Sequence, residues 1–319
     1  MIERIFHPVG QGAFYSEKHD IENNYFNIVY DCGSKQKKKA IPVVSKSFNI
    51  NESIDILFIS HFDYDHVSLI ETLKNNFKIK TVVLPLLHSE EIFLLSTLFD
   101  SKDEKNLSSL VSRPEEFFGE ATSIVRVRAT EARKEPEELG KISSSDIPNT
   151  IDSGTAITLL NIDWAYIPFN YDYKKRNKDL KSLFVSEGID IKRLKKDRDY
   201  LNNNRAKIRK IYSQLQGTVN QNSMLVYSGP LSSNNYKRNY QFCQSCSTPI
   251  YYNRIDNRLN RVACVFTGDM NLNTIVLRDI YNSIWKYVGT IQIPHHGDAH
   301  SFDKNILRPL HEVSFSNLF

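Results

Sequence analysis

The sequence predicts an α/β fold. Short apolar segments with the composition of strands alternate with segments whose apolar residues have helical spacing, and this alternation occurs in both the first and the last hundred residues. Such alternation is typical of α/β proteins. A chain of 319 residues with 40% hydrophobic content is also long enough to bury a large core. We therefore expect one α/β domain over residues 1–319, built from two halves.

The elements of the first half follow from the same pattern. We expect strands at residues 3–9 (ERIFHPV), 25–31 (YFNIVYD), 54–60 (IDILFIS) and 80–87 (KTVVLPLL), and a helix at residues 67–77 (VSLIETLKNNF). The stretch from about 101 to 152 contains acidic, Ser-rich and Pro-containing segments, and we expect it to be an insertion outside the core.

The second half begins with strand patterns at residues 155–161 and 163–172. A basic region at about 172–217 follows, and its apolar spacing suits one or two amphipathic helices in a second insertion. Strand patterns return in NSMLVYSG, RVACVFTGD and GTIQIPHHG, with a helical pattern at residues 273–288.

Charge and cysteine content limit the class of protein. The net charge is only +4, but Lys and Arg are dense between residues 174 and 210. Such a stretch could bind a polyanion, or it could be the solvated face of a helix. The candidate nucleic-acid-binding residues are Lys195, Lys196, Arg205 and Arg209. Four scattered cysteines do not form a disulfide framework, and neither a membrane segment nor a secretion signal is evident, so we expect a cytoplasmic protein.

The strongest local signal is the segment SHFDYDH, which follows the strand pattern at 54–60 and precedes a helix. His61, Asp63, Asp65 and His66 can converge from one turn, whereas a regular strand would direct alternate side chains to opposite faces. Imidazole and carboxylate are ligands of zinc, iron and manganese. The alternative is a polar turn that contains these four residues by chance.

Two further segments place similar residues at strand ends. In FTGDM, Asp269 follows an apolar strand and a glycine that allows a tight turn, and a carboxylate there could bridge two cations or cap the next helix. In IQIPHHGDAHS, His295 and His296 end another strand. Adjacent histidines point in different directions, so we expect one to bind metal and the other to contact substrate or orient a ligand; which one does which is left open. We expect His300 to be a surface histidine or one that orients a ligand.

The ordered set of these motifs resembles the metallo-β-lactamase superfamily. H-x-D-x-D-H, then Asn220 to Ser223, then TGD, then PHHG occur in the family's order, and VGQGAF and YDCGS are similar to the start of the branch that contains the nuclease domains of ComEC-type competence proteins. The resemblance implies an αβ/βα four-layer sandwich. It also implies that His61 and Asp63 bind a first metal, that Asp65 and His66 bind a second, and that Asp269 bridges them. Asn220, Asn222 and Ser223 would contact substrate or metal.

The sequence departs from the family pattern at several positions. Asp63 replaces the second histidine of the commoner HxHxDH motif, no histidine lies between His88 and His295, and Val67 and Ser68 replace two glycines. Related domains often continue past the position of Phe319 with another histidine, so either truncation or an altered pocket is expected here. A carboxylate-rich site suits harder ions, so we expect one or two divalent cations, with manganese favoured over zinc.

These residues predict a metal-dependent hydrolase. We expect a phosphodiesterase or nuclease that acts on DNA through a metal-activated water, with Asp65, His295 and His296 as catalytic residues. A hydrolase of a small or peptide substrate is the alternative enzyme. A different class of alternative is a catalytically degenerate binding or sensor module of a multi-component system, for example in defence, with a protein partner that the sequence does not identify.

Overall fold

The structure is a computed structural model of the chain. It describes residues 1–21, 24–98, 105–130, 140–171, 182–194, 197–214, 223–232, 261–272, 277–297, 301 and 314–316.

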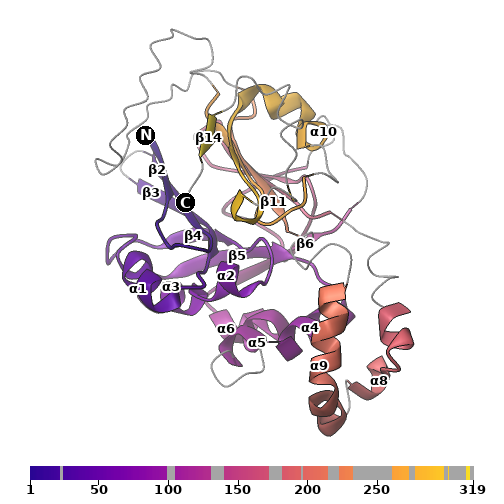
Figure 1. Ribbon diagram of the computed structural model, residues 1–319. Coiled ribbons are helices and arrows are strands. Elements are labelled where there is room, and N and C mark those ends of the chain that lie inside the picture. The colour runs from indigo at the N-terminus through magenta and orange to yellow at the C-terminus, as the bar shows by residue number, and fades with distance from the viewer. Residues whose placement is uncertain are drawn as a thin grey trace.

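Two mixed sheets form the centre of the molecule (Figure 1). The first contains, in spatial order, β1 (Ile2–Phe6), β2 (Phe14–Ile21), β3 (Asn24–Cys32), β4 (Ile54–Phe58), β5 (Ile79–Pro85), β6 (Ser123–Arg128) and β8 (Thr150–Asp152). The second contains β14 (Ser314–Ser316), β13 (Val288–Gln292), β12 (Ala263–Phe266), β11 (Leu225–Gly229), β10 (Ala165–Phe169), β9 (Ala156–Thr158) and β7 (Lys141–Ser143).

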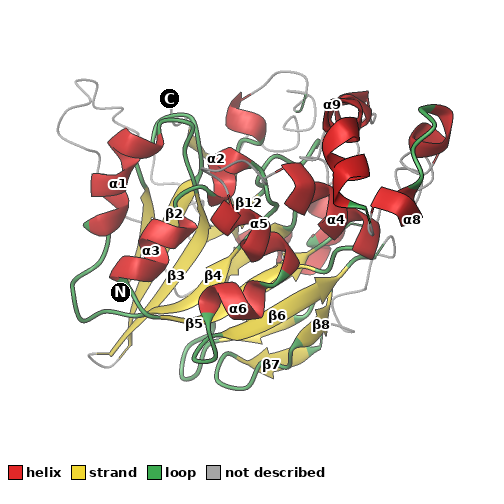
Figure 2. Cartoon of the chain, turned by 90° about the horizontal axis from the view of Figure 1, so that it is seen from below, coloured by secondary structure: helices red, strands yellow, loops and turns green. Residues whose placement is uncertain are grey.

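Helices cover the outer faces of both sheets (Figures 1 and 2). On the first sheet these are α1 (Lys37–Ser45), α2 (Tyr64–Val67), α3 (Ile70–Asn76), α4 (Ser89–Leu98), α5 (Lys105–Ser112) and α6 (Pro114–Phe118). On the second they include α10 (Leu277–Ile280) and the 3-10 helix η4 (Asn282–Tyr287). Each sheet is thus buried on both faces, which explains strands such as IDILF whose five residues are all buried.

Three apolar cores lie between these layers. Between the two sheets, side chains such as Phe58 of β4 and Val226 of β11 share one core. A second core joins the first sheet to its helices, and a third joins the second sheet to α10 and η4. The α/β class and the four-layer αβ/βα arrangement expected from the sequence are therefore confirmed.

Strand direction determines where the loops meet. β3, β4, β5, β6 and β8 are parallel, as are β12 and β13 in the other sheet. Because parallel strands end at the same edge of a sheet, the segments that follow β3 and β4 lie together. The candidate site is built at this edge.

The structure differs from the sequence expectation in part of the range 101–152. Strand β6 pairs with β5 and β8 inside the first sheet, so much of this range belongs to the core rather than to an excursion from it. The polar stretch on which that expectation rested is 133–148: its first part, 133–139, lies outside the described residues, whereas its second part contains β7 (Lys141–Ser143). The sequence reading also missed β2, because FYSEKHDI contains too many charged residues to be recognised as a strand.

Helices α8 (Ile191–Leu194) and α9 (Arg198–Gln214) lie within the expected basic insertion. Apolar side chains of this region, including Phe184, Leu194 and Ile208, form a small core of their own, against which Phe93 of α4 packs. Within the described ranges, every helix is too short or too polar to cross a lipid bilayer.

Candidate metal centre

The site begins in the loop after β4. Ile54 to Phe58 are all buried, and the chain then turns through 59–63 into the short helix α2, whose N-cap is Asp63. The backbone N–H of His66 donates to the carbonyl oxygen of Asp63 at 2.9 Å. This sharp turn points His61 and His66 toward each other, and their ring centroids lie 4.1 Å apart.

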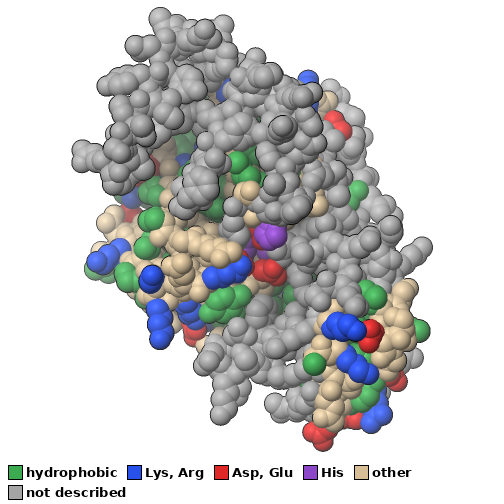
Figure 3. All heavy atoms as spheres, viewed as in Figure 1, with side chains coloured by type: hydrophobic (Ala, Val, Ile, Leu, Met, Phe, Trp, Pro, Cys, Tyr) green, Lys and Arg blue, Asp and Glu red, His purple; other side chains and the backbone are tan. Residues whose placement is uncertain are grey.

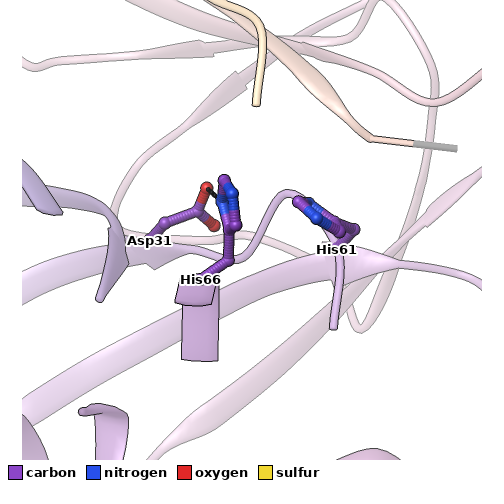
Figure 4. Close-up of side chains that lie close together, drawn as sticks. All are labelled: Asp31, His61 and His66. Atoms are coloured by element: carbon purple, nitrogen blue, oxygen red, sulfur yellow. Dashed lines mark hydrogen bonds and ion pairs between the residues drawn. The ribbon is translucent and has the colours of Figure 1, made fainter. Parts of the chain in front are cut away.

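A carboxylate from the neighbouring strand orients both imidazoles. Asp31, near the end of β3, is fully buried and has a φ of 55°, in the left-handed region. Its Oδ1 accepts from the backbone N–H of Ser60 at 2.7 Å, and its Oδ2 lies 2.6 Å from Ser60 Oγ and 2.8 Å from His66 Nδ1. Figure 4 shows Asp31 facing His66 across this contact. Because an ionised carboxylate only accepts, Ser60 Oγ and His66 Nδ1 both donate to it.

The tautomer of His61 follows from the same network. Ser60 Oγ lies 2.8 Å from His61 Nδ1 and has already given its proton to Asp31, so it accepts from the imidazole. Ser223 Oγ lies 3.1 Å from the same nitrogen. In both histidines Nδ1 therefore faces the protein interior, and Nε2 is the atom that faces the site. Such outer contacts fix a metal-binding histidine in position.

The second half of the chain brings Asp269 to these two Nε2 atoms. Oδ1 of Asp269 lies 3.1 Å from His66 Nε2, and Oδ2 lies 3.9 Å from His61 Nε2. Asp63 Oδ2 also lies 3.9 Å from His61 Nε2. The side chain of Asp269 is only 3% exposed, whereas that of Asp63 is 28% exposed. Residues more than two hundred positions apart thus converge on one point.

The charges around His66 make this point attractive to a cation. Burial alone would lower the pKa of His66, but the carboxylates of Asp269 and Asp31 raise it well above its ordinary value. The negative potential that stabilises a proton on the His66 imidazole also stabilises a divalent cation. The cation can bind only after this proton has left the imidazole.

The donor set fits a divalent metal ion. Ligand atoms that share an ion at about 2.1 Å lie about 3 to 4 Å from one another, and the distances from Asp269 oxygens to Nε2 of His61 and of His66 fall in that range. Asp31, His61 and His66 also offer ligand atoms within 4.8 Å of one another. Asp31, however, already accepts three hydrogen bonds, so we assign it to orientation of the imidazoles rather than to the ion.

Comparison with protein families agrees with this geometry. Residues 21–141 match the family model of the metallo-beta-lactamase superfamily. The match includes Asp31 and the whole SHFDYDH segment, while Asp269 lies beyond it. A comparison with curated proteins found no match. Metallo-beta-lactamase superfamily proteins are generally metal-dependent hydrolases; closeness to the ComEC-type branch stays a prediction.

Glycines of the two N-terminal motifs pack closely against the backbone of the turn that carries His66. A Cβ on Gly33 would lie 2.5 Å from the backbone of Asp65 and of His66, and one on Gly12 would lie 2.4 Å from the carbonyl oxygen of Gly33. The backbone N–H of Ala13 donates to the carbonyl oxygen of Asp65. VGQGAF and YDCGS therefore contain glycine where three backbone segments touch.

Ser68, which replaces a glycine of the common metallo-beta-lactamase motif, has a structural role here. Its hydroxyl accepts from the backbone N–H of Ser34 at 2.9 Å and donates to the carbonyl oxygen of Ser34 at 3.0 Å. The substitution therefore adds a clamp between α2 and the turn after β3.

Buried polar contacts position Asp269. The backbone N–H of Asp269 donates to Ser223 Oγ at 3.0 Å, and the preceding Gly268 has a φ of 53°. Oε1 of Gln292 accepts from the backbone N–H groups of Thr267 and Gly268. Ser223 is fully buried, so it lies behind the ligands and holds them rather than facing solvent. Gln292 was not identified from the sequence.

Two other sequence candidates lie near the candidate centre. Asp65 Oδ2 is 3.5 Å from Nζ of Lys35, and its side chain is 9% exposed. The backbone N–H of His295 is 3.4 Å from the carbonyl oxygen of Gly268, and its Nδ1 is 3.4 Å from Ser301 Oγ. The PHHG loop thus touches the TGD turn.

Several sequence candidates lie outside the described part of the chain. These are Asn220, Asn222, Lys195, Lys196 and His300, together with the side chains of His296, Arg205 and Arg209.

The sequence reading missed Asp31 as a functional residue. It treated YDCGS only as a match to the start of a family branch. The usable signal was an acidic residue at the end of an apolar strand pattern, two positions before a glycine, in the strand that precedes IDILFIS in the sequence.

Proposed function

We propose that the chain is a metal-dependent phosphodiesterase that hydrolyses nucleic acid, most concretely DNA. One observation carries the proposal: two imidazole Nε2 atoms and the carboxylate of Asp269 converge at the edge of the sheet, held by a buried network. The match of residues 21–141 to a superfamily of metal-dependent hydrolases supports the reaction class.

His61, His66, Asp63 and Asp269 would hold the ion. Both oxygens of Asp269 face the site, so this carboxylate could also serve a second ion if one binds. Asp65 or His295 would complete the ligands of a second metal ion. The carboxylate-rich donors favour Mn²⁺, with Zn²⁺ as the other candidate. When bound, the metal supplies a water of lowered pKa and stabilises charge on the phosphoryl oxygens.

The chain's own residues would position the reactants. Asp65 is mostly buried beside the ligand turn, where it can accept a hydrogen bond from the attacking water and take its proton. Attack at phosphorus forms one P–O bond and breaks another, leaving a phosphate monoester and an alcohol. His295 or His296 would protonate the departing alkoxide.

Two observations support nucleic acid as the substrate. One is the concentration of positive charge in the basic region, and the other is the resemblance of VGQGAF and YDCGS to the start of the branch that contains ComEC-type nuclease domains. Positive residues are concentrated in the basic region at 172–217, which we propose to be an insertion of a single domain. Electrostatic attraction of the phosphate backbone supplies most of the affinity of sequence-independent nucleases.

The test compares turnover of wild type, His66→Ala and Asp269→Asn on single-stranded and double-stranded DNA with Mn²⁺, Mg²⁺ or Zn²⁺. We expect each substitution to lower turnover by at least about a hundredfold, since each removes a ligand or its charge. Asp163→Asn is the matched control, because Asp163 precedes β10 and its carboxylate accepts from Ser232, which follows β11, so neither residue belongs to the candidate centre.

Each other outcome contradicts a defined part of the proposal. Full turnover in both variants would reject the assigned centre. Hydrolysis of small esters without DNA cleavage would reject DNA as the substrate. A wild type with less than one metal per chain and no turnover would instead indicate the binding or sensor module.

A further inference from the structure

Four lysines lie within five positions at the start of α1. We call Lys35, Lys37, Lys38 and Lys39 the α1 lysine cluster. The side chain of Lys35 is 53% exposed, Lys38 and Lys39 are exposed, and Lys37 is half-buried. The basic stretch at 174–210 drew attention in the sequence, whereas this cluster, which lies outside it, did not.

The topology places the cluster beside the candidate metal centre. Helix α1 connects the parallel strands β3 and β4, so it runs back along the sheet and begins at the edge where these strands end. Nζ of Lys35 lies 3.5 Å from Oδ2 of Asp65, next to His66. In Figure 3, blue side chains lie over α1 and extend toward the red and purple side chains at the centre of this face.

Helix stability does not account for these lysines. The N-terminus of a helix is its positive end, where acidic residues are favourable and basic residues are unfavourable. No acidic residue occupies the first turn of α1, and its N-cap residue, Gln36, makes no capping hydrogen bond with its side chain. Residues that are unfavourable for the local structure, such as lysines at the positive end of a helix, are expected where they serve a function.

Among the described residues, only Lys35 of the four cluster lysines has a carboxylate partner, Asp65. In the part of the chain that the structure describes, no salt bridge joins Lys37, Lys38 or Lys39 to a carboxylate. Basic residues elsewhere do have such partners: Lys18 pairs with Glu52 and Lys80 with Asp55.

The described part of the basic insertion contrasts with the cluster. Lys210 of α9 pairs with Glu187, and Arg193 of α8 pairs with Asp197. Part of the positive charge there is therefore neutralised within the protein, whereas the charge of Lys37, Lys38 and Lys39 is available to an external anion.

We propose that the α1 lysine cluster binds the phosphate backbone of the nucleic acid, on the side of the cleaved phosphodiester toward α1. This inference rests on the proposed function and specifies where its substrate docks. Lysine ammonium groups act as point charges that attract phosphates without reading bases. Binding through the cluster is therefore independent of nucleotide sequence and strongly weakened by salt.

The test measures binding without catalysis. Fluorescence polarisation of a labelled oligothymidylate is followed in EDTA, at salt concentrations from about 50 to about 200 mM. The variant is Lys38→Gln with Lys39→Gln. The matched control is Lys46→Gln with Lys78→Gln, which removes the same charge from exposed lysines at the opposite end of α1 and of the strands.

The slope of log affinity against log salt decides the result. Each phosphate contact on single-stranded DNA contributes about 0.7 to this slope, so losing two should reduce it by about 1.4. The ratio of affinities at about 50 and about 200 mM salt then falls about sevenfold. The control should keep the wild-type slope, and Lys39→Gln alone should give half of the change.

Three results would overturn the inference: an unchanged slope in the cluster variant, an equal loss in the control, or no binding by wild type at about 50 mM salt. Folding is not a confounding factor, because removing positive charge from a helix N-terminus should not lower the unfolding midpoint. Failure of the proposed function is distinguishable, since Asp269→Asn should lose metal-dependent turnover but retain metal-free binding.

Discussion

At the scale of single residues, the buried carboxylate of Asp31 organises the centre. It accepts from the backbone and hydroxyl of Ser60 and from His66, and through Ser60 it also fixes His61. The sequence predicted the HFDYDH residues because His and Asp at a strand end are recognisable. It did not predict Asp31, whose importance comes from a contact between two strands that a linear sequence does not show.

Asp31→Asn should weaken metal binding. The amide keeps the shape of the side chain, but it loses the charge, and one of its atoms becomes a donor facing the donors of Ser60 and His66. We expect metal affinity to fall by about 10- to 100-fold, and the free energy of unfolding to fall by about 2 kcal/mol.

Competition with a chromophoric chelator measures the affinity, and urea unfolding measures the stability. Asp163→Asn, which changes a partly exposed carboxylate bonded to Leu231 and Ser232, should keep wild-type metal affinity. If Asp31→Asn bound metal as tightly as wild type, the imidazoles would be oriented by something else.

At the scale of elements, the strands with continuous apolar runs were predictable, and those with mixed composition were not. IDILF and VVLP are buried on both faces and show this in the sequence. FYSEKHDI was missed because the polar side chains of Glu17 and His19 are buried between the sheets, where their partners come from distant parts of the chain. The location of β6 was missed because the polar stretch after it led us to expect an insertion over the whole range 101–152.

Gly33→Ala tests whether the glycine motifs brace the ligand turn. A Cβ there would lie 2.5 Å from backbone atoms of Asp65 and His66, which cannot move independently of the ligands. We expect the free energy of unfolding to fall by about 2 to 3 kcal/mol or more, with a loss of metal affinity.

Gly140→Ala is the control, because a Cβ at Gly140 meets nothing within 4 Å. Thermal unfolding of both variants, with and without Mn²⁺, gives the comparison. Equal stability of Gly33→Ala and wild type would show that the turn is not tightly braced.

At the scale of the whole molecule, a buried polar network joins the two sheets. Glu17 of β2 accepts from Tyr166 of β10 at 2.7 Å and from Ser228 of β11, and it forms a salt bridge with Arg4 of β1. These contacts join the first sheet to the second behind the candidate site. The metal centre needs ligands from both sheets, so the network helps to keep their relative position.

This network predicts a pH dependence of stability. Burial would raise the pKa of Glu17, but attraction to Arg4 and hydrogen bonds from His19 and Ser228 lower it below its ordinary value. A carboxyl whose pKa is lowered by folding stabilises the fold above its unfolded pKa of about 4.3, and this contribution is lost as the pH falls. The difference in free energy of unfolding between wild type and Glu17→Gln should therefore shrink from pH about 6 to pH about 3.

Urea unfolding at several pH values gives this difference. Exposed Glu3→Gln in the adjacent strand should match wild type throughout. A difference for Glu17→Gln that stays constant or grows toward low pH would mean that the ionised carboxylate does not stabilise the fold.

Anomalous scattering from a crystal grown with Mn²⁺ tests most directly whether His61, His66 and Asp269 hold a shared divalent cation. We predict an anomalous peak about 2.2 Å from Nε2 of His61 or His66 and from a carboxylate oxygen of Asp269. The peak should be absent from crystals of Asp269→Asn. A wild-type crystal without a peak among these residues, or with manganese bound only elsewhere, would contradict the assignment.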